Sequence, residues 1–389
     1  MKTKTKRIPY GRQWIGKEEI RALTSVLRSD FLTQGRKVQE FEADLARKVG
    51  AKYAVAVSNG TAALHLAAIV AGLKPGDEVI TTPISFLATS NAALYVGAKP
   101  VFVDIDPATQ CIDANEIENK ITPRTNAIFF TDFAGHPAEL MKIHSIAKKH
   151  HLSVIEDAAH ALGSVYCGSK IGACRYSDMT IFSFHPVKHI TTGEGGAITT
   201  NDGKLYSRLC DLRSHGVTRD PGRLISKNVG PWYYEMQALG FNYRLTDIQA
   251  AMGIVQLKKL DLFVERRQAI AEKYRNAFRD VPMVLLPAER VGSKHAYHLF
   301  VIRLQGKLVG RRDAIFAELQ KRGVGVQVHY IPIPSQPYYR KLGYRVGDCP
   351  KAQAYYCSAI SLPMFPKMTD GEVAFVANTV KDVIRMHFK

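Results

Sequence analysis

The sequence predicts an α/β protein in which a mostly parallel sheet is covered by helices on both faces. Short apolar runs typical of buried strands alternate with helix-like stretches over residues 53–200. A long helical stretch then leads to a second region with its own strand and helix patterns. Polar residues follow several predicted strands, and ligands of such sheets collect at the carboxyl ends of strands. We therefore expect a large ligand-binding domain followed by a smaller α+β domain.

The apolar runs of the large domain are rich in Val, Ile and Phe, which favour strands. They predict strands at 53–57, 78–82, 99–103, 127–130, 152–156, 179–183 and 196–200. Helices are predicted between several of them, at 61–70, 86–96 and 137–150. This alternation is the pattern of a seven-stranded, mostly parallel sheet.

The second region begins with one long predicted helix, which starts near Thr246 and Asp247 and ends near Phe278. The smaller domain is predicted to contain strands at 298–303 and 325–329 and a helix at 311–322. We expect two domains. They are an N-terminal arm with the large domain at 1–255, and the smaller domain at 256–389.

Composition excludes several classes of protein. The chain of 389 residues is 46% hydrophobic, enough for a sizeable core, and carries a net charge of +18. Its basic residues are dispersed and no nucleic-acid motif is present, so we expect no nucleic-acid partner. The apolar stretch 54–73 is too interrupted by polar residues to span a membrane.

Targeting signals and cysteine usage predict a cytoplasmic protein. The N-terminus has basic residues but no apolar segment after them, so we expect no signal peptide. The six cysteines form no C-x-x-C pair and match no metal-ligand spacing. We therefore expect reduced thiols and no metal site.

Lys188 is the candidate catalytic residue. It follows the predicted strand 179–183 and precedes a turn rich in Thr and Gly at 191–196. A lysine amine buried beside a sheet is costly unless it is paired or neutralised, whereas an imine with an aldehyde removes the charge and makes the lysine a catalyst. Most loop lysines are surface residues, and the surroundings of Lys188 favour the catalytic role.

Asp157 directly follows the predicted strand 152–156, where it is expected to face the ring nitrogen of a pyridine. A carboxylate at contact distance favours the protonated ring nitrogen, which makes the ring an electron sink. His160 is expected to contact the ring or its phenolic oxygen. A helix cap for Asp157 and a structural role for His160 remain alternatives.

The remaining signals concern a phosphate and a flat ring. Thr61 and Ala62 lie where a predicted strand turns into a helix, whose N-terminal N–H groups favour phosphate, although an ordinary N-cap is the alternative. Ser183 precedes Lys188 closely enough to offer its hydroxyl to the same phosphate. Phe86 is a candidate to stack on the ring, with a core role as the alternative. Together these residues predict the cofactor pyridoxal 5'-phosphate (PLP).

Several longer segments carry a resemblance to a known family. They are Thr33-Gln34-Gly35, Ser58 to Leu64, Glu156 to Gly163, Phe182 to Lys188, Thr192 to Gly196 and Gly240 to Asp247. On these segments the chain resembles the DegT/DnrJ/EryC1/StrS sugar aminotransferases over nearly its whole length. The resemblance implies a PLP-dependent enzyme of fold type I, with the aspartate aminotransferase-like fold.

The resemblance also implies roles for the candidate residues. Lys188 is implied to bind the PLP aldehyde and to move the proton during exchange between PLP and its amino form, PMP. Asp157 is implied to hold the ring nitrogen, and His160 to occupy the ring position where the family often has Gln. The implied phosphate ligands are Thr61, Ala62 and Ser183. Asn242 is implied to reach the cofactor of a neighbouring subunit, so a homodimer with shared active sites is expected.

Within the family, segment 183–188 is most similar to the 4-aminotransferases of pseudaminic acid synthesis, with support from 30–35 and 328–332. Those enzymes aminate a UDP-linked 4-keto-6-deoxy-N-acetylhexosamine with L-glutamate as the donor. The resemblance implies substrate contacts at Tyr10, Asp30, Phe31, Leu32, Thr33, Tyr330, Ile331, Pro332 and Ile333. His189 stands where Pro is expected, a departure that bears on the identity of the sugar and leaves the lysine chemistry intact.

Three alternatives stay open at this point. The first is an aminotransferase for another nucleotide-linked 3- or 4-ketosugar. The second is a deoxysugar dehydratase of the same fold. Such enzymes are known to carry histidine at the position that Lys188 occupies in this chain, so the lysine argues against this alternative. The third is a non-catalytic ligand sensor or nucleic-acid binder, which has no need of Lys188 and Asp157 together.

Overall fold

A seven-stranded sheet forms the centre of the protein in the computed structural model, which describes residues 7–227 and 229–388. In spatial order its strands are β1 (Tyr53–Val57), β9 (Gly196–Thr200), β8 (Met179–Ser183), β5 (Ser153–Asp157), β4 (Thr125–Thr131), β2 (Glu78–Thr81) and β3 (Lys99–Phe102). β9 runs antiparallel to both of its neighbours, and the other pairs are parallel. The predicted α/β class with a mostly parallel sheet is confirmed.

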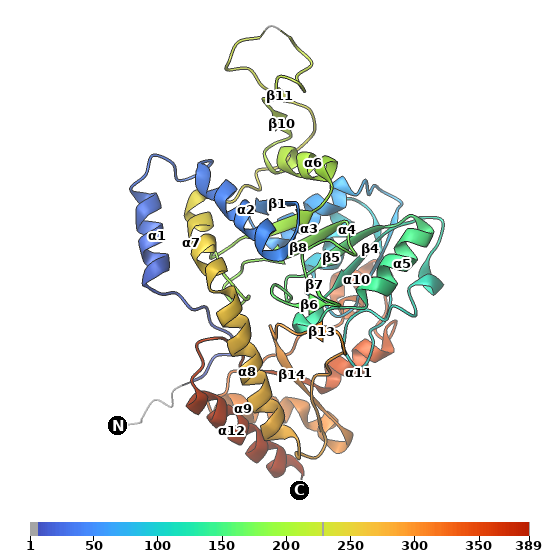
Figure 1. The fold of residues 1–389 in the computed structure, drawn as a ribbon. Helices are drawn as coiled ribbons and strands as arrows, with labels where there is room; N and C mark the ends of the chain where they lie inside the picture. Colours follow the sequence, from blue (N-terminus) through green and yellow to red (C-terminus); the bar gives the residue numbers. More distant parts are fainter. Residues whose placement is uncertain (1–6, 228, 389) are drawn as a thin grey trace.

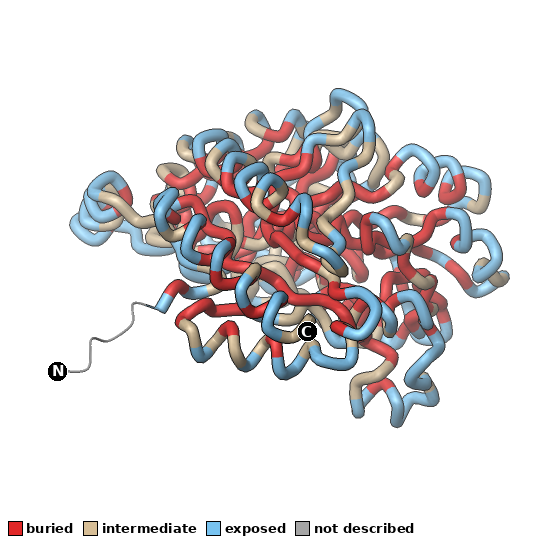
Figure 2. Tube along the Cα trace, turned by 90° about the horizontal axis from the view of Figure 1, so that it is seen from below, coloured by how far each residue is buried: buried red, intermediate tan, exposed pale blue. Residues whose placement is uncertain are grey.

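Helices cover both faces of this sheet because its strands are apolar on both sides. Alternate residues of β1 enter different cores: Val55 and Val57 belong to one cluster, and Ala54 and Ala56 to the other. The first cluster includes residues of α3 (Gly60–Val70), α4 (Ala88–Tyr95) and α6 (Gly203–Arg213). The second includes residues of α2 (Arg36–Val49), α5 (Leu140–His150) and α7 (Asp247–Lys258). Figure 2 shows the buried trace running through the interior between exposed outer turns.

The long helix predicted from 246 to 278 is two helices, α7 and α8 (Leu260–Phe278). Lys259 separates them, and its amine bonds to Glu19 of α1 (Lys17–Leu27) at 2.8 Å. The sequence pattern predicted a single helix. It did not reveal the break, because the ion-pair partner of Lys259 lies in α1, which is far away in the sequence. α8 continues into the lower part of the molecule in Figure 1.

The smaller region has its own core and its own sheet. The sheet has the order β12 (Val284–Leu285), β14 (Phe300–Leu304) and β15 (Ala359–Leu362), and the helices are α9 (Arg312–Lys321), α11 (Pro350–Ser358) and α12 (Asp370–Phe388). Its buried residues pack mainly between α8, α9, α12 and this sheet. The predicted strand 325–329 is absent, because this segment makes only one single-residue bridge, that of Gln327 with Ser361. A domain boundary at residue 255 stays a prediction.

The remaining elements are short. They are β6 (Val165–Tyr166), β7 (Ser169–Lys170), β10 (Val217–Thr218), β11 (Glu235–Met236), β13 (Ser293–Lys294), α10 (Pro337–Lys341) and the 3₁₀ helices at Glu118–Lys120, Phe133–Gly135, Gly306–Arg311 and Ile333–Ser335. β10 and β11 form an arm that projects from the molecule at the top of Figure 1. Within residues 7–227 and 229–388, no helix is both long and apolar enough to cross a bilayer.

Candidate active site

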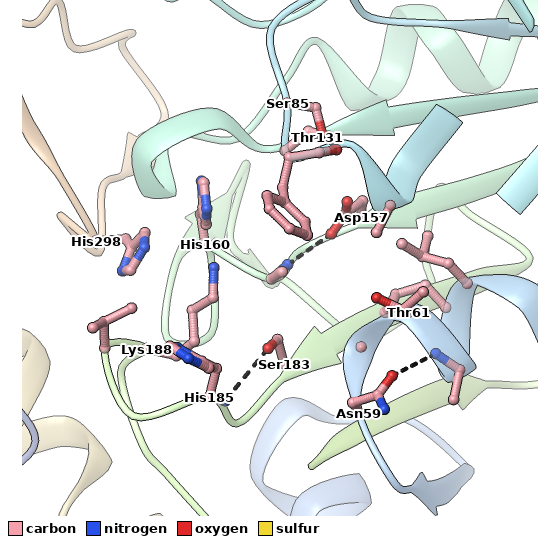
Figure 3. Close-up of a pocket in the computed structure, with 18 of the residues that line it drawn as sticks. Asn59, Thr61, Ser85, Thr131, Asp157, His160, Ser183, His185, Lys188 and His298 are labelled. Atoms are coloured by element: carbon pink, nitrogen blue, oxygen red, sulfur yellow. Dashed lines mark hydrogen bonds between the residues drawn. The ribbon is translucent and has the colours of Figure 1, made fainter. Parts of the chain in front are cut away.

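A cavity of about 900 Å³ lies at the carboxyl ends of the central strands and is also lined from the smaller region. Three strands end in polar residues that line it: β4 in Thr131, β5 in Asp157 and β8 in Ser183. His298 and Tyr330 belong to the smaller region and line the same cavity. Figure 3 shows His160 above the side chain of Lys188, His298 to the upper left, and Ser183 and Thr61 to the right. The position agrees with the rule for ligand sites in open α/β sheets.

Asp157 is a buried carboxylate with no cationic partner within ion-pair distance among the described residues. Its side chain is 5% exposed. Oδ2 accepts a hydrogen bond of 2.5 Å from the hydroxyl of Thr89, and Oδ1 accepts one of 3.1 Å from the N–H of Ala159. Burial raises the pKa of Asp157, while these two hydrogen bonds and the charge of Lys188 oppose the rise.

A chain of hydrogen-bonded hydroxyl groups ends on the carboxylate of Asp157. Thr131 donates to Ser85 at 3.1 Å, Ser85 and Thr89 are joined by a short hydrogen bond, and Thr89 donates to Asp157. Each hydroxyl in this chain has one proton to donate, so the direction that ends on the carboxylate satisfies all of them. The arrangement stabilises the ionised form of Asp157.

Lys188 lies in the loop between β8 and β9, and hydrogen bonds within the loop set its position. Phe184 donates its N–H to Gly195 at 2.8 Å, and Lys188 donates its N–H to His185 at 2.9 Å in a tight turn. The side chain of Lys188 lines the cavity and has no hydrogen-bond partner among the described residues. Burial lowers the pKa of Lys188 to about 8, an effect that Asp157 opposes and Arg267 strengthens.

The N-terminus of α3 forms a cup beside Ser183. Asn59 caps the helix by accepting a 2.8 Å bond from the N–H of Ala62, which leaves the N–H groups of Gly60 and Thr61 without an acceptor in the described parts of the chain. A Cβ atom on Gly196 of β9 would lie 2.5 Å from the Asn59 backbone, so only glycine permits this close approach. Free N–H groups and a nearby hydroxyl suit a phosphate.

His160 is held between two partners that determine its tautomer. Nδ1 accepts a 3.3 Å bond from the N–H of Ala134, and Nε2 lies 3.2 Å from the hydroxyl of Tyr330. Because Nδ1 is an acceptor, we assign the ring proton to Nε2, which donates it to the Tyr330 oxygen. Burial lowers the pKa of His160 well below its ordinary value, as does the charge of Lys188. The Tyr330 hydroxyl therefore keeps its own proton to donate into the cavity.

Most of the predicted site residues line this one cavity. They are Tyr10, Thr61, Ala62, Phe86, Asp157, His160, Ser183, Lys188 and Tyr330. Phe86 precedes α4 and is 58% exposed, and its ring centroid lies 6.4 Å from that of Tyr330. Their individual roles stay predictions.

The other predicted residues do not line the cavity of their own chain. Asp30, Phe31, Leu32 and Thr33 are exposed on the loop between α1 and α2, and Asn242 is exposed near the base of the arm. Pro332 and Ile333 are buried, and the N–H of Ile333 donates to Pro83 at 3.0 Å. Ile331 is 45% exposed.

Sequence reasoning missed several residues that shape the site. They are His65, Ser85, Thr89, Tyr95, Thr131, His185, Glu194, Tyr243, His298 and His329. Thr89 had a usable signal, because it lies one helical turn beyond Phe86. The sequence contained no signal for His298, because a histidine at the start of a predicted strand is normally interpreted as a core residue.

The cavity fits PLP group by group. The free N–H groups of α3 and Ser183 would hold the phosphate, and Asp157 would hold a protonated ring nitrogen, which supplies its missing cation. Phe86 would contact the ring, and the unpartnered amine of Lys188 would bind the aldehyde. The fold and this site define a PLP-dependent enzyme of fold type I.

The particular family follows from comparison with known proteins. Residues 13–381 match the DegT/DnrJ/EryC1/StrS aminotransferase family, and the chain belongs to it. The protein is a PLP-dependent sugar aminotransferase, so the alternative of a non-catalytic binder is set aside.

Its relatives agree with this assignment. The spore coat polysaccharide biosynthesis protein SpsC of Bacillus subtilis is 42% identical over 97% of each chain. The structure is similar to PseC of Helicobacter pylori, an aminotransferase involved in the biosynthesis of pseudoaminic acid, with a TM-score of 0.91, 34% identity and coverage of 98% of this chain and 100% of that one. It is also similar to the sugar aminotransferase Spr1654 of Streptococcus pneumoniae, solved in PLP and PMP forms. Each form has a TM-score of 0.91 and 31% identity, covering 98% of this chain and all of the other.

Proposed function

We propose that this enzyme is a cytoplasmic homodimer that transfers an amino group from L-glutamate to C4 of a UDP-linked 4-keto-6-deoxy-N-acetylhexosamine, in a pseudaminic acid or related deoxyamino sugar pathway. The observation that carries the proposal is the arrangement of Lys188, Asp157 and the α3 cup in one cavity. The likeness to PseC and the sequence of segment 183–188 support this choice of sugar.

PLP, when bound, supplies an aldehyde that carries the amino group and a ring that accepts electron density at the reacting carbon. Lys188 acts as the general base and acid that moves a proton at C4 of the sugar. Its pKa of about 8 suits this work, because both protonation states are populated near neutral pH. Proton transfer by a positioned group contributes typically about 10²–10⁴-fold to the rate.

The other residues orient and enclose the reactants. Asp157 keeps the ring nitrogen protonated, and Thr89 keeps Asp157 ionised. Tyr330, fixed by His160, donates its proton to an oxygen at the reacting end of the cavity. Tyr10 and Tyr330 contact the sugar, and their aromatic rings help to exclude water.

The charge of the cavity supports a second subunit. Among the described residues that line it, Lys188 is the only lysine or arginine. Both proposed substrates are anionic, so we expect further positive groups to come from outside this chain's own cavity. Asn242 and the loop 30–33 are exposed, which is consistent with contacts to a neighbouring subunit. The arm also exposes a set of large apolar side chains typical of interfaces, at Ile225, Trp232, Met236 and Leu239.

A labelling experiment tests the cofactor site. The protein is loaded with PLP, reduced with borohydride, digested and mapped by mass spectrometry. We expect the reduced adduct on Lys188, and a Lys188→Ala variant that takes up no label and has no turnover. An adduct on a different lysine, or multiple turnovers by the variant, would overturn the assignment.

A substrate panel tests the sugar. UDP-, GDP- and dTDP-linked ketosugars are incubated with enzyme and glutamate, and the amino sugar and 2-oxoglutarate are quantified. We expect the largest kcat/KM for the UDP-linked 4-keto-6-deoxy-N-acetylhexosamine, with the new amine at C4 by NMR. A preference for another nucleotide or for C3 would favour the second candidate, another ketosugar aminotransferase, which the likeness to SpsC also accommodates.

A further inference from the structure

Arg267 is a buried arginine without a counter-ion. It lies in α8 with 1% of its surface exposed. No carboxylate lies within ion-pair distance of its guanidinium in the described parts of the chain, whereas the buried Arg213 is paired with Glu42. Burying an unpaired charge is costly, so such a residue calls for a specific explanation.

The guanidinium binds backbone carbonyls from three separate segments. Nη1 donates to Tyr297 and His298 at 3.2 Å each, and to Met364 at 3.0 Å. Nη2 lies 3.5 Å from the carbonyl oxygen of Val187, the residue immediately before Lys188. Arg267 therefore connects the turn that carries Lys188 to two segments of the smaller region, one of which carries His298 into the cavity.

Carbonyl dipoles solvate the guanidinium but leave its charge uncompensated. Burial alone lowers the pKa of Arg267 to about 9, and its positive charge lowers the pKa of Lys188. The opposing charge at Lys188 is that of Asp157, which raises the amine's pKa. Four histidines near the amine have pKa values lowered mainly by burial and stay neutral near pH 7: His160, His189, His298 and His329. Burial raises the pKa of Tyr330, so this hydroxyl is neutral too, and His185 and Glu194 also line the cavity. Arg267 and Asp157 are thus the two opposing charges that act on this amine.

We propose that Arg267 is a positioning residue for Lys188: its guanidinium holds the Lys188 turn against the smaller region, and its uncompensated charge favours the neutral amine. The inference rests on the proposed role of Lys188 as the residue that binds the cofactor. It assigns Arg267 two effects that substitutions separate, because lysine keeps the charge with fewer hydrogen bonds and methionine removes both.

The test measures the protonation of Lys188 without turnover. Only a neutral amine attacks an aldehyde, so the rate at which cofactor-free enzyme takes up PLP, followed by visible absorbance, rises with pH and levels off above the amine's pKa. We call the pH at which the rate levels off the break. In the wild type we expect the break near pH 8. Arg267→Met should move it upward by about one pH unit, because a nearby like charge has been removed. Arg267→Lys should keep the break near pH 8 while lowering the rate at every pH.

Arg275→Met is the matched control on the same helix. Arg275 also binds a carbonyl, that of Pro287, but it is paired with Glu289 and touches no residue of the Lys188 turn. This variant should lose stability and keep the wild-type break. Arg267→Gln replaces the methionine variant if that protein does not fold.

The outcomes separate this inference from the proposed function. Borohydride labelling on Lys188 with an unchanged break in the folded neutral variant overturns the role of Arg267 alone. An equal upward shift in Arg267→Lys and Arg267→Met overturns the effect of charge. If the wild-type break lies at the ordinary lysine pKa of 10.5, the proposed effect of the Arg267 charge is overturned by the wild-type measurement alone. Labelling elsewhere overturns the assignment of Lys188 itself.

Discussion

The hydroxyl of Thr89 donates a 2.5 Å hydrogen bond to Oδ2 of Asp157, although the two residues are 68 positions apart in the chain. The bond joins the first turn of α4 to the last residue of β5. It gives the buried carboxylate a hydrogen-bond donor, and this stabilises the ionised form of Asp157.

Replacing Thr89 with Val should weaken cofactor binding about tenfold or more, because hydrogen bonds to charged groups contribute about 1.5–3 kcal/mol. Valine keeps the shape of threonine, so the fold should persist. The dissociation constant of PLP from absorbance titration is the measurement. Thr379→Val is the control, because Thr379 bonds only within α12, to Phe375 at 2.8 Å. Equal affinities for wild type and Thr89→Val would argue against this role of the bond.

Replacing Tyr330 with Phe should lower kcat/KM about five- to tenfold, because one hydrogen bond to a reactant contributes about 1 kcal/mol. It should also lower the free energy of unfolding, because the N–H of the buried His160 loses its acceptor. The ring remains, so cavity shape is kept. The control is Tyr274→Phe, whose hydroxyl bonds to the carbonyl of Pro363 at 2.9 Å in the core of the smaller region. It should lower the free energy of unfolding and leave kcat/KM unchanged. If kcat/KM is unaffected by Tyr330→Phe, the tyrosine proton has no part in the reaction.

Asp132→Asn should stabilise the protein at neutral and alkaline pH. Asp132 and Glu156 are both buried, and each has one oxygen without a donor among the described residues. Burial raises the pKa of both carboxyls, and the charge of Glu156 raises that of Asp132 further. Raised values mean that folding favours the protonated forms, so wild-type stability falls as pH rises from the ordinary values of 3.8 and 4.5 toward the raised ones.

Melting temperatures from about pH 2.5 to pH 9 measure this effect. The gain of Asp132→Asn over the wild type should be largest at alkaline pH and vanish near pH 4. Asp113→Asn is a control of opposite sign: despite burial, hydrogen bonds from Lys351 and Asn115 lower the pKa of Asp113. That variant should be less stable than the wild type at neutral pH, with the difference lost as pH falls below the ordinary value. A gain from Asp132→Asn that is independent of pH would contradict the explanation by proton linkage.

Gly196→Ala should damage the phosphate cup, because the new Cβ would lie 2.5 Å from the carbonyl carbon and oxygen of Asn59. Crowding of this kind costs about 1–3 kcal/mol. We expect both a lower melting temperature and weaker binding of PLP. Gly371→Ala is the control, since no atom lies within 4 Å of a Cβ there and the residue is in the first turn of α12. A variant at Gly196 that behaves like the one at Gly371 would contradict this account of the cup.

The strands of the central sheet were predictable because they are buried on both faces and read as continuous apolar runs. β1, β8 and β9 have the predicted bounds, and the other predicted strands differ by a few residues at their ends. The segment 325–329 was predicted as a strand on the same kind of pattern and is not one. Its apolar residues are buried by neighbouring segments, and the segment forms no continuous hydrogen-bonded pairing with another strand. A local sequence pattern does not distinguish these two situations.

The sequence alone determined the chemistry available to the site: a lysine after one strand, a carboxylate after another, and a turn suited to phosphate. Local patterns record these features because each depends on residues close together in the chain. The tertiary structure decided which side chains adjust that chemistry, including Thr89 behind Asp157, Tyr330 on His160 and Arg267 beside the Lys188 turn. These contacts join residues far apart in sequence, and burial in a shared low-dielectric interior gives them their strength. Neither the distance between two such residues nor their burial is present in the sequence before the chain has folded.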